Sequence, residues 1–441
     1  MSVQNPVVTS LDSPEFVVSE EALVPVNSYP STQIDIPASK MFVIKKSLDV
    51  YRQKFGADAI VFDASQGDGG ASLPGVPKPL LERAQQLQLE HGTGYDFGYG
   101  TDLFRKKTAE VYWQFAPSTG YGPQNIVATD GGRDGLIKAY QAMITLGTGR
   151  VGDALLVSRV PWISYNWGPY EVGQNVLLAP GQEDSAWQYT EDALAASVEF
   201  SEKHGHRKIA GMVITSPDNP TGNTLPMQRQ IELARKGLEL GIPFILFDWI
   251  YHRVTSGQSA DINQVLNAFS VEERKRLIFL DGLTKSLGAS NIRNAHLVAS
   301  EQVCKFVSNR ASHSVLPNFY GQAIALAAYE QGFDKAAAPI VGPTNASREI
   351  VRKFLKEKGY KHIIGDGGYY AFIHTGPALA HSGLKDSEAF TSYIVENYGI
   401  AVIPGIHFSK AGKDWVRFSY ALPPEKTEKA LARFDEAFRS L

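Results

Sequence analysis

Short apolar segments alternate with helical patterns through the middle of this 441-residue chain, and that alternation limits what it can fold into. Strands are predicted at Ile126–Ala128, Ala154–Ser158, Asn175–Leu178, Ile209–Thr215, Pro243–Phe247, Leu277–Leu280 and His296–Ala299. Helical patterns lie between several of them, for example at Pro226–Leu240. Strands that alternate with helices predict an α/β domain with a mostly parallel sheet.

The pattern changes after about residue 330, where a smaller α+β unit is predicted. Its predicted elements are a helix over Ser347–Gly359, strands at Tyr370–Ile373 and Val416–Phe418, and a last helix over Pro424–Leu441. Nearer the N-terminus, we expect a helix over Ala38–Phe55, ended by Gly56, and a short strand at Ala59–Asp63. The chain is too long for one simple core, so two domains are expected.

We therefore divide the chain into three parts. Residues 1–45 form an N-terminal extension that either wraps the body or a neighbouring subunit, or is loose. Residues 76–329 form a large domain, and residues 46–75 and 330–441 form a small one.

Composition excludes several classes of function. The net charge is −3 and there is no basic arm, so no nucleic-acid partner is expected. No apolar run has transmembrane length and the acidic N-terminus does not resemble a signal peptide, which predicts no membrane partner and a cytoplasmic location. A single cysteine, Cys304, excludes a disulfide framework, and ten histidines without paired spacing predict no metal site.

The segment around Lys285 reads LDGLTKSLGASNIRNAHLVAS. Upstream lie TSPDNPTGNT and FDWIYHRV, and WVRFSYA lies downstream. Lys285 follows a predicted strand and is expected in a loop beside apolar structure, where burial lowers the pKa of an amine and makes it a nucleophile and a proton carrier. An aldehyde cofactor needs such an amine to hold it as a Schiff base. The set of residues is the one that pyridoxal phosphate (PLP) requires from a protein.

Two further motifs supply groups for the cofactor's ring. Asp248, at the end of a predicted strand, is placed to keep a ring nitrogen protonated, because a nearby carboxylate raises the pKa of a pyridinium. Strand ends are where open α/β sheets bind their ligands. Tyr251 and Asn219 are each able to donate a hydrogen bond to the ring oxygen.

A glycine-rich turn supplies the phosphate site. TDGGRDGL, from Thr129 to Leu136, follows a strand and opens a helix. Gly131 and Gly132 let the backbone approach a phosphate, and the helix N-terminus favours an anion. Arg293, eight residues after Lys285, is able to clamp the phosphate with two hydrogen bonds.

These motifs resemble the fold-type I PLP enzymes, and among them the class I/II aminotransferases. The resemblance covers about residues 60–441. It rests on SPDNPTG, on the D-x-x-Y of Asp248 and Tyr251, on the Lys285-to-Arg293 spacing, and on VIPG followed by VRFSYA. It implies the aspartate aminotransferase-like fold, a large domain with a mostly parallel sheet plus a smaller α+β domain.

The resemblance also implies roles. Lys285 would form the aldimine with PLP and carry the proton, Asp248 would pair with the ring nitrogen, and Asn219 and Tyr251 would bind the ring oxygen. Trp162 would stack on the ring. Gly132 and Arg133 would offer N–H groups to the phosphate, beside Gly131, Thr284 and Arg293.

The same resemblance implies how substrate and a second subunit contribute. Arg417 would grip the α-carboxylate of an amino acid or keto acid, with Gly67 and Asn219 also at the substrate. Tyr95, in YDFGYGTDLFR, matches a tyrosine that reaches the phosphate of the neighbouring subunit, which implies a homodimer.

Four positions depart from the family pattern. Gly282 replaces a hydroxyl residue that touches the phosphate, with Thr284 or water as the substitute, and Ala295 replaces a glycine. Trp249 replaces an acidic residue, and Arg133 stands where a small or hydroxyl residue is common. These changes leave the PLP prediction standing and bear on which reaction is catalysed.

Three other signals favour plain structural interpretations. The segment from Gly147 to Gly152 fits the pattern G-x-G-x-x-G. It follows a predicted helix and precedes a predicted strand, whereas a dinucleotide site has the strand first and the helix second. The segment is therefore predicted to be a loop that ends a helix. The aromatic run Trp162–Tyr170 is predicted to pack in the core rather than to form an aromatic substrate pocket. His252, His296 and His407 are predicted to pack or form hydrogen bonds rather than act as bases.

The sequence thus predicts a PLP-dependent aminotransferase that moves the amino group of an α-amino acid to a keto acid. The alternative is a PLP-dependent lyase, cyclase or oxidase of specialised metabolism that uses the same residues. A PLP-fold sensor or regulatory domain is a third possibility, disfavoured because the full residue set is present and no DNA-binding appendage is recognisable.

Overall fold

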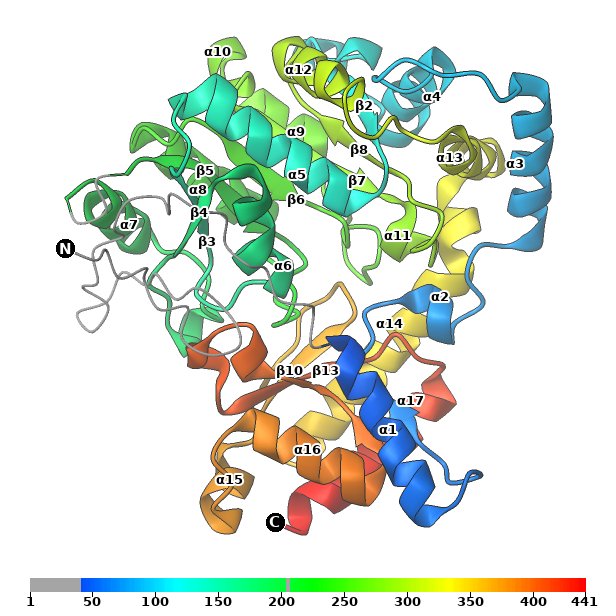
Figure 1. The fold of residues 1–441 in the computed structure, drawn as a ribbon, viewed down its shortest axis with the longest axis vertical. Helices are drawn as coiled ribbons and strands as arrows, with labels where there is room; N and C mark the ends of the chain where they lie inside the picture. Colours follow the sequence, from blue (N-terminus) through cyan, green and yellow to red (C-terminus); the bar gives the residue numbers. More distant parts are fainter. Residues whose placement is uncertain (1–40, 204–206) are drawn as a thin grey trace.

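The computed structural model describes residues 41–203 and 207–441 (Figure 1). The predicted extension at residues 1–45 falls outside this part except for its last five residues, as does the start of the helix predicted from Ala38. The described helix α1 covers Met41–Phe55 and ends before Gly56, as predicted.

A seven-stranded sheet forms the centre of the larger part of the molecule. Its strands, in spatial order, are β2 (Ile126–Thr129), β8 (Ala295–Val298), β7 (Leu277–Gly282), β6 (Ile245–Asp248), β5 (Ile209–Thr215), β3 (Ala154–Val157) and β4 (Asn175–Leu178). Only β8 runs antiparallel to its neighbours. The predicted mostly parallel α/β sheet is confirmed. Two strands have the predicted bounds, and the other five differ by one or two residues.

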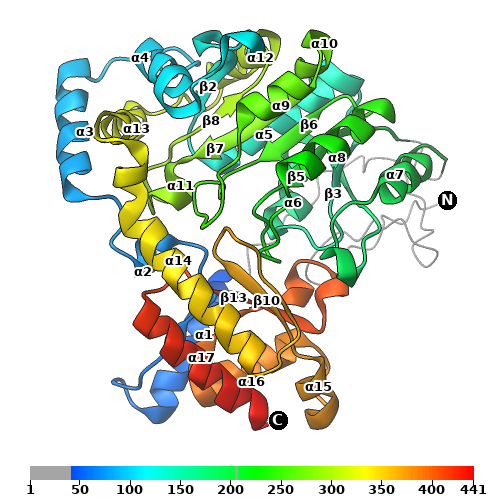
Figure 2. The same ribbon diagram turned by 180° about the vertical axis from the view of Figure 1, so that it is seen from behind.

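Helices cover both faces of this sheet. They are α3 (Lys78–His91), α4 (Asp102–Lys107), α5 (Gly132–Ala142), α6 (Ile163–Trp167), α7 (Glu191–Lys203), α8 (Met227–Glu239), α9 (Ile262–Ala268), α10 (Val271–Arg274), α11 (Leu283–Ser286), α12 (Glu301–Ala311) and α13 (Phe319–Gln331). One apolar core joins the sheet to α3, α8, α9 and α13, and another joins it to α5, α6 and α12. Figures 1 and 2 show these two layers from opposite sides.

A second, smaller core surrounds a four-stranded antiparallel sheet. Its strands, in spatial order, are β12 (Ile403–Pro404), β13 (Trp415–Ser419), β10 (Tyr370–His374) and β9 (His362–Ile363), and a separate parallel pair joins β1 (Phe62–Asp63) to β11 (Ile400–Ala401). The helices here are α1, α2 (Gly69–Ser72), α14 (Phe333–Glu357), α15 (Gly376–Ser382), α16 (Ser387–Tyr398) and α17 (Pro424–Arg439). The strand predicted at Ala59–Asp63 is thus shorter than expected.

Short π- and 3-10-helical turns complete the described elements. They are η2 (Thr108–Trp113), η3 (Pro117–Thr119), η4 (Pro123–Asn125), η5 (Met143–Thr148), η6 (Gly168–Val172), η7 (Glu183–Ser185), η8 (Gly405–His407) and η9 (Lys410–Gly412). Gly149 ends η5 with a left-handed φ of 70°, and β3 begins at Ala154, so the G-x-G-x-x-G segment is the helix-ending loop predicted from the sequence.

Helix α14 corrects one prediction. A helix was expected from Ser347, but α14 begins at Phe333 and continues through Pro339 and Pro343. Proline inside a helix removes a hydrogen bond and normally ends or kinks it. Here the buried residues Phe333 and Ile340 bind the proline-containing turns into the core, so packing overrides local preference. α14 runs from α11 and α13 beside the large sheet to α17 beside the small one (Figure 2).

Register brings three strand ends to one edge of the large sheet. In the parallel pairs, Thr215 lies opposite Asp248, and Asp248 lies opposite Leu280. The segments that follow β5, β6 and β7 therefore leave the sheet side by side and face the small sheet (Figures 1 and 2). The boundaries of the predicted domains, at residues 76 and 330, stay a prediction.

No helix in the described ranges is long and apolar enough to cross a membrane. Within the same ranges, no group of three or more His, Cys, Asp and Glu side chains is arranged to hold a metal ion.

Gly222 joins the two sheets and provides a test of the fold. Its φ is +71°, and a Cβ there would lie 2.0 Å from the carbonyl oxygen of Tyr370. Gly241 has a similar φ of +85° with nothing within 4 Å of its Cβ position. We expect Gly222→Ala to lower the free energy of unfolding by about 1–3 kcal/mol more than Gly241→Ala, measured by urea denaturation, because only Gly222→Ala adds a steric clash. Equal losses would show that the contact with β10 is not tight.

Candidate active site

Lys285 lies at the carboxyl edge of the large sheet. It was expected in a loop, but it belongs to the one-turn helix α11, which starts directly after β7. The amine donates a hydrogen bond to the carbonyl oxygen of Gly67, and Nζ lies 5.4 Å from the centroid of the Tyr251 ring. The hydroxyl of Tyr369 donates to the Lys285 carbonyl oxygen at 2.5 Å. The side chain is thereby held between the two sheets.

Electrostatics prepare this lysine for reaction. Burial, helped by the positive charges of Arg417 and Arg133, lowers the pKa of Lys285 to about 8, although Asp68 and Asp248 oppose the shift. About a tenth of the amine is therefore neutral at pH 7, far more than for an ordinary lysine. A neutral amine is the nucleophilic form.

Asp248 is the last residue of β6 and is buried. Its carboxylate accepts a hydrogen bond from the Tyr165 hydroxyl at 2.5 Å and another from the backbone N–H of Ile250 at 3.1 Å. Burial raises the pKa of Asp248 to about 6, although both hydrogen bonds and the charge of Lys285 act in the other direction. Tyr165 was treated in the sequence only as one of a run of core aromatics. The run is indeed core, since Tyr165, Trp167 and Tyr170 are buried, but Tyr165 also positions this carboxylate.

Arg417 reaches the same place from β13 of the small sheet. It is fully buried, and it donates to Asn219 Oδ1 at 2.8 Å and to the Ser65 carbonyl oxygen at 2.6 Å. Its Nε has no hydrogen-bond partner, and no carboxylate in the described residues forms an ion pair with it. A buried cation paired only with neutral oxygens is costly unless an anion joins it. The guanidinium is thus arranged to receive a carboxylate.

Asn219 is the link between the two sheets at this point. Its Oδ1 is used by Arg417, and Nδ2 has no hydrogen-bond partner in the described residues. The loop that carries it is shaped by Asp218, which accepts hydrogen bonds from the backbone and the hydroxyl of Thr221. A free amide donor at this position suits an oxygen on a ligand.

The turn before α5 forms a second group of donors. Gly131 has a φ of +88°, and a Cβ there would lie 2.3 Å from Arg293 Nη2, so only glycine lets the guanidinium approach the helix start. Arg293 itself has a left-handed φ of 57° and donates to the Ser290 carbonyl oxygen at 2.7 Å. The backbone N–H groups of Gly132 and Arg133 begin α5 and have no partner in the described residues. A helix N-terminus beside a guanidinium is a ready anion site.

Arg133 and Trp162 lie together at this end of the site. The Arg133 guanidinium is 5.6 Å from the centre of the Trp162 ring. Desolvation and the nearby charge of Arg293 both lower the pKa of Arg133. Trp162 precedes α6 and packs edge-on against Tyr165. No hydrogen bond involves the Thr284 side chain in the described part of the chain.

Tyr95 lies away from these residues. It belongs to the loop between α3 and α4, and it is 99% exposed, with the nearby Phe97 84% exposed. Tyr95 therefore takes no part in the site of its own subunit as the chain stands.

Two departures from the family pattern are neighbours in the large sheet. Gly282 and Ala295 are cross-strand partners on β7 and β8. A Cβ at Gly282 would lie 2.7 Å from each of the Ala295 Cα, the Ala295 Cβ and the Asn294 carbonyl oxygen. The backbone of this part of β8 and the Ala295 methyl group therefore both exclude a hydroxyl side chain at 282. Trp249, the third departure, is fully buried and donates to Gln230 Oε1 at 2.9 Å, which is a packing role.

The histidines near the site have the hydrogen-bonding and packing roles that were expected. His252 bonds to Asp281 at 2.9 Å and to the Tyr112 hydroxyl at 3.1 Å, and Trp113 donates to His296 at 2.7 Å. This buried cluster lies on the sheet face covered by α3 and α13. His407 is buried and bonds to Glu388 at 3.1 Å.

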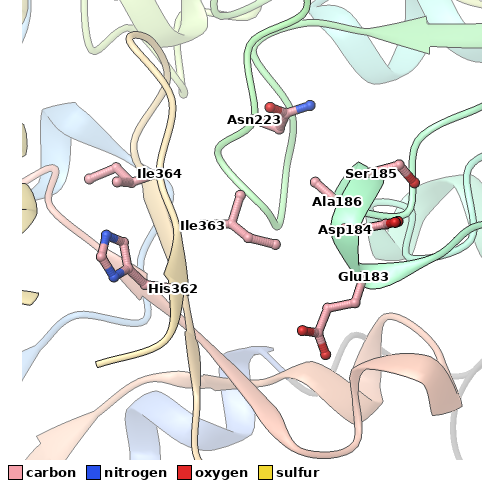
Figure 3. A pocket seen from close by; sticks show the side chains of 8 residues that line it. All are labelled: Glu183, Asp184, Ser185, Ala186, Asn223, His362, Ile363 and Ile364. Carbon is pink, nitrogen blue, oxygen red and sulfur yellow. The ribbon is translucent and has the colours of Figure 1, made fainter. Parts of the chain in front are cut away.

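A cavity of about 370 Å³ lies nearby but holds none of the predicted site residues. Its lining residues are Glu183, Asp184, Ser185, Ala186, Asn223, His362, Ile363 and Ile364. Figure 3 shows Ile363 pointing from its strand toward the 183–186 segment. Glu183 at its rim pairs with Lys361 across the two parts of the molecule. The cavity is separate from Lys285 and Arg417.

The residues at the sheet edge fit PLP. The lysine of lowered pKa suits the aldehyde of PLP, and the buried carboxylate suits its ring nitrogen. The free amide donor suits the ring oxygen, and the helix N-terminus with its arginine suits the phosphate. The glycine at 131 leaves the room that the arginine needs, and the unpaired Nε of Arg417 leaves a donor for a substrate carboxylate.

Comparison with known proteins decides the family. The family model for aminotransferase class I and II matches residues 57–434. The chain belongs to this family. Family members depend on PLP, so the protein is a PLP-dependent aminotransferase and has the aspartate aminotransferase fold.

Relatives of this aminotransferase are distant in sequence. The aspartate aminotransferase of Bacillus subtilis is 23% identical over 90% of this chain and 95% of its own length. The aromatic-amino-acid aminotransferase 2 of Thermococcus litoralis is 25% identical over 86% of this chain and 94% of its own. The solved structure of aspartate aminotransferase from Thermotoga maritima superposes with a TM-score of 0.76 at 22% identity, covering 92% of this chain and 98% of that one.

The lowered pKa of Lys285 gives a direct measurement. Only the neutral amine reacts with an acylating reagent, so we expect the rate of Lys285 acetylation by acetic anhydride in cofactor-free aminotransferase to rise with pH through a midpoint of about 8. The acetylation rate of Lys285 is measured by peptide mapping with mass spectrometry. The pH range of about 6 to 11 includes the ordinary lysine pKa of about 10.4. Lys305, an exposed lysine on α12, provides the reference. A Lys285 midpoint no lower than that of Lys305 would contradict the electrostatic argument.

Proposed function

We propose that this aminotransferase uses Lys285 to move the amino group of an α-amino acid onto a keto acid. The observation that carries the proposal is the pairing of two features at one sheet edge. Lys285 has a lowered pKa, and the buried Arg417 has no carboxylate partner in the described residues. An arginine without a carboxylate partner beside a lysine amine of lowered pKa is the arrangement that an amino-acid substrate needs.

The other residues hold the cofactor in the proposed site. Asp248 would keep the ring nitrogen protonated, and its pKa, raised to about 6 by burial, falls once a cation pairs with it. Asn219 Nδ2 and the Tyr251 hydroxyl would donate to the ring oxygen. Trp162 would cover one ring face. Arg293 and the N–H groups of Gly132 and Arg133, next to Gly131, would hold the phosphate, with Thr284 close to it.

In this proposal, Arg417 binds the substrate and Lys285 transfers the proton. PLP, when bound, supplies the electron sink that makes the Cα–H bond of an amino acid acidic. Arg417 binds the α-carboxylate and so fixes Cα next to Lys285, with Gly67 and Asn219 bordering the substrate. Lys285 Nζ would accept the Cα proton and later release it, as a base with a pKa near the working pH does efficiently.

We further propose a homodimer in which Tyr95 reaches the phosphate of the neighbouring subunit. Tyr95 and Phe97 expose almost their whole rings in the single chain, as suits residues that a second copy covers. The only cysteine, Cys304, is buried and free, which agrees with the reducing conditions of the cytoplasm.

The half-reaction tests the proposed chemistry. Single amino acids are added to PLP-loaded protein without keto acid, and absorbance and released keto acid are followed. We expect conversion of the cofactor to pyridoxamine phosphate with one keto acid released per site, and loss of at least about 10³-fold in rate in Lys285→Ala but not in Lys305→Ala. Release of another product without pyridoxamine phosphate would favour a lyase, cyclase or oxidase. Unchanged activity in Lys285→Ala would refute the proposed role of the lysine.

Combining two impaired variants in one dimer tests the shared site. Tyr95→Ala should weaken PLP binding by about 10- to 100-fold if the hydroxyl donates to a charged phosphate. Co-expression of Tyr95→Ala and Lys285→Ala chains should then restore about a quarter of wild-type activity at limiting PLP, because half of the dimers are mixed and each has one intact site. Absence of recovery in purified mixed dimers would place Tyr95 outside the neighbouring site.

A further inference from the structure

A tyrosine pair joins the two sheets beside Lys285. The hydroxyl oxygens of Tyr251, in the turn after β6, and Tyr370, the first residue of β10, lie 2.7 Å apart. Both side chains are buried, at 4% and 1% exposure, so no solvent competes for this hydrogen bond. The sequence singled out Tyr251, but gave no signal for Tyr370.

The guanidinium of Arg417 lies over the ring of Tyr370. The two are 4.2 Å apart, and Tyr370 and Arg417 lie on adjacent strands of the small sheet. A cation over an aromatic face is attracted to it, most strongly where water is excluded. Tyr370 is thus in contact with the carboxylate anchor on one side and with Tyr251 on the other.

The backbone around Gly67 is fitted to the same hydroxyl. A Cβ at Gly67 would lie 1.8 Å from Tyr370 Oη, so glycine is required there for the phenol to keep its place. The Gly67 carbonyl oxygen accepts the hydrogen bond of the Lys285 amine. One small loop therefore holds both the lysine and the tyrosine hydroxyl.

Either hydroxyl is able to donate across this distance. The Arg417 cation lies over the ring of Tyr370, and a positive charge there stabilises a phenol that gives up its proton, which favours Tyr370 as the donor. With Tyr370 as the donor, the Tyr251 proton is left to point elsewhere.

We propose that the Tyr370 hydroxyl is a positioning group of the active site, which orients the Tyr251 proton toward the cofactor's ring oxygen and couples that donor to the substrate anchor Arg417. This inference rests on the proposed PLP site. Tyr370 acts through Tyr251, so its effect depends on the presence of the Tyr251 hydroxyl.

The test is a double-mutant cycle read by spectroscopy. PLP-loaded wild type, Tyr251→Phe, Tyr370→Phe and the double variant are titrated with acid and base while the visible absorbance of the bound cofactor is recorded, without substrate. A donor to the ring oxygen stabilises its negative charge, and losing that donor makes the cofactor hold its proton more tightly. We expect Tyr370→Phe to raise the titration midpoint by about 0.5–1 pH unit, less than Tyr251→Phe does.

The double variant decides whether Tyr370 acts through Tyr251. We expect it to match Tyr251→Phe alone, because coupled residues are not additive. Tyr189→Phe, which removes a buried hydroxyl bonded to Val213 at 2.8 Å, serves as the control and should leave the midpoint unchanged. Additive shifts, or no shift in Tyr370→Phe, would overturn the inference.

A second measurement guards against misfolding of the variant. Incorporation of a ring-fluorinated tyrosine at position 370 keeps the hydroxyl and makes it a stronger donor, so the midpoint should fall rather than rise. A midpoint that does not move would contradict the inference. Failure of wild-type protein to develop any visible absorbance with PLP would instead refute the proposed function, and so the two failures are distinguishable.

Discussion

The parallel register of β5, β6 and β7 is the constraint on which the site depends. Because Thr215, Asp248 and Leu280 lie side by side, the loop with Asn219, the carboxylate of Asp248 and the turn with Lys285 leave the sheet at one edge. A slip of one residue in any pair would turn a strand's side chains to the opposite face. The apolar strands, buried on both faces, fix that register through two separate cores.

The small sheet contributes the arginine and a tyrosine that complete the site at the edge of the large sheet. Arg417 and Tyr370 come from adjacent strands of the small core and meet Asn219 and Tyr251 from the large one. Burying the guanidinium without a carboxylate costs free energy, and two neutral oxygens offset only part of it. The free energy released when an anion arrives is therefore available for binding, and it acts where the two sheets meet.

Much of this arrangement could be predicted from the sequence, because it follows from local rules. Strand and helix periodicity located the large sheet, and Lys285, Asp248, Asn219 and Arg293 stand in motifs of fixed spacing. Periodicity failed at α14, where packing of Phe333 and Ile340 outweighs two prolines. It also gave no role to Tyr165 or Tyr370, because an aromatic residue in a buried segment looks the same in sequence whether its hydroxyl is used or not. Contacts between segments far apart in the chain, such as Gly67 with Tyr370 about 300 positions later, leave no local pattern in the sequence.

The facing pair of Gly282 and Ala295 limits how this sequence can change. A side chain at 282 would meet the Ala295 Cα and the Asn294 carbonyl oxygen as closely as it meets the Ala295 methyl group. Glycine at 295 would therefore remove only one of three overlaps, and a larger residue at 282 also needs a shift of the β8 backbone. The spacing between β7 and β8 thus restricts the substitutions that a descendant of this chain tolerates at residue 282.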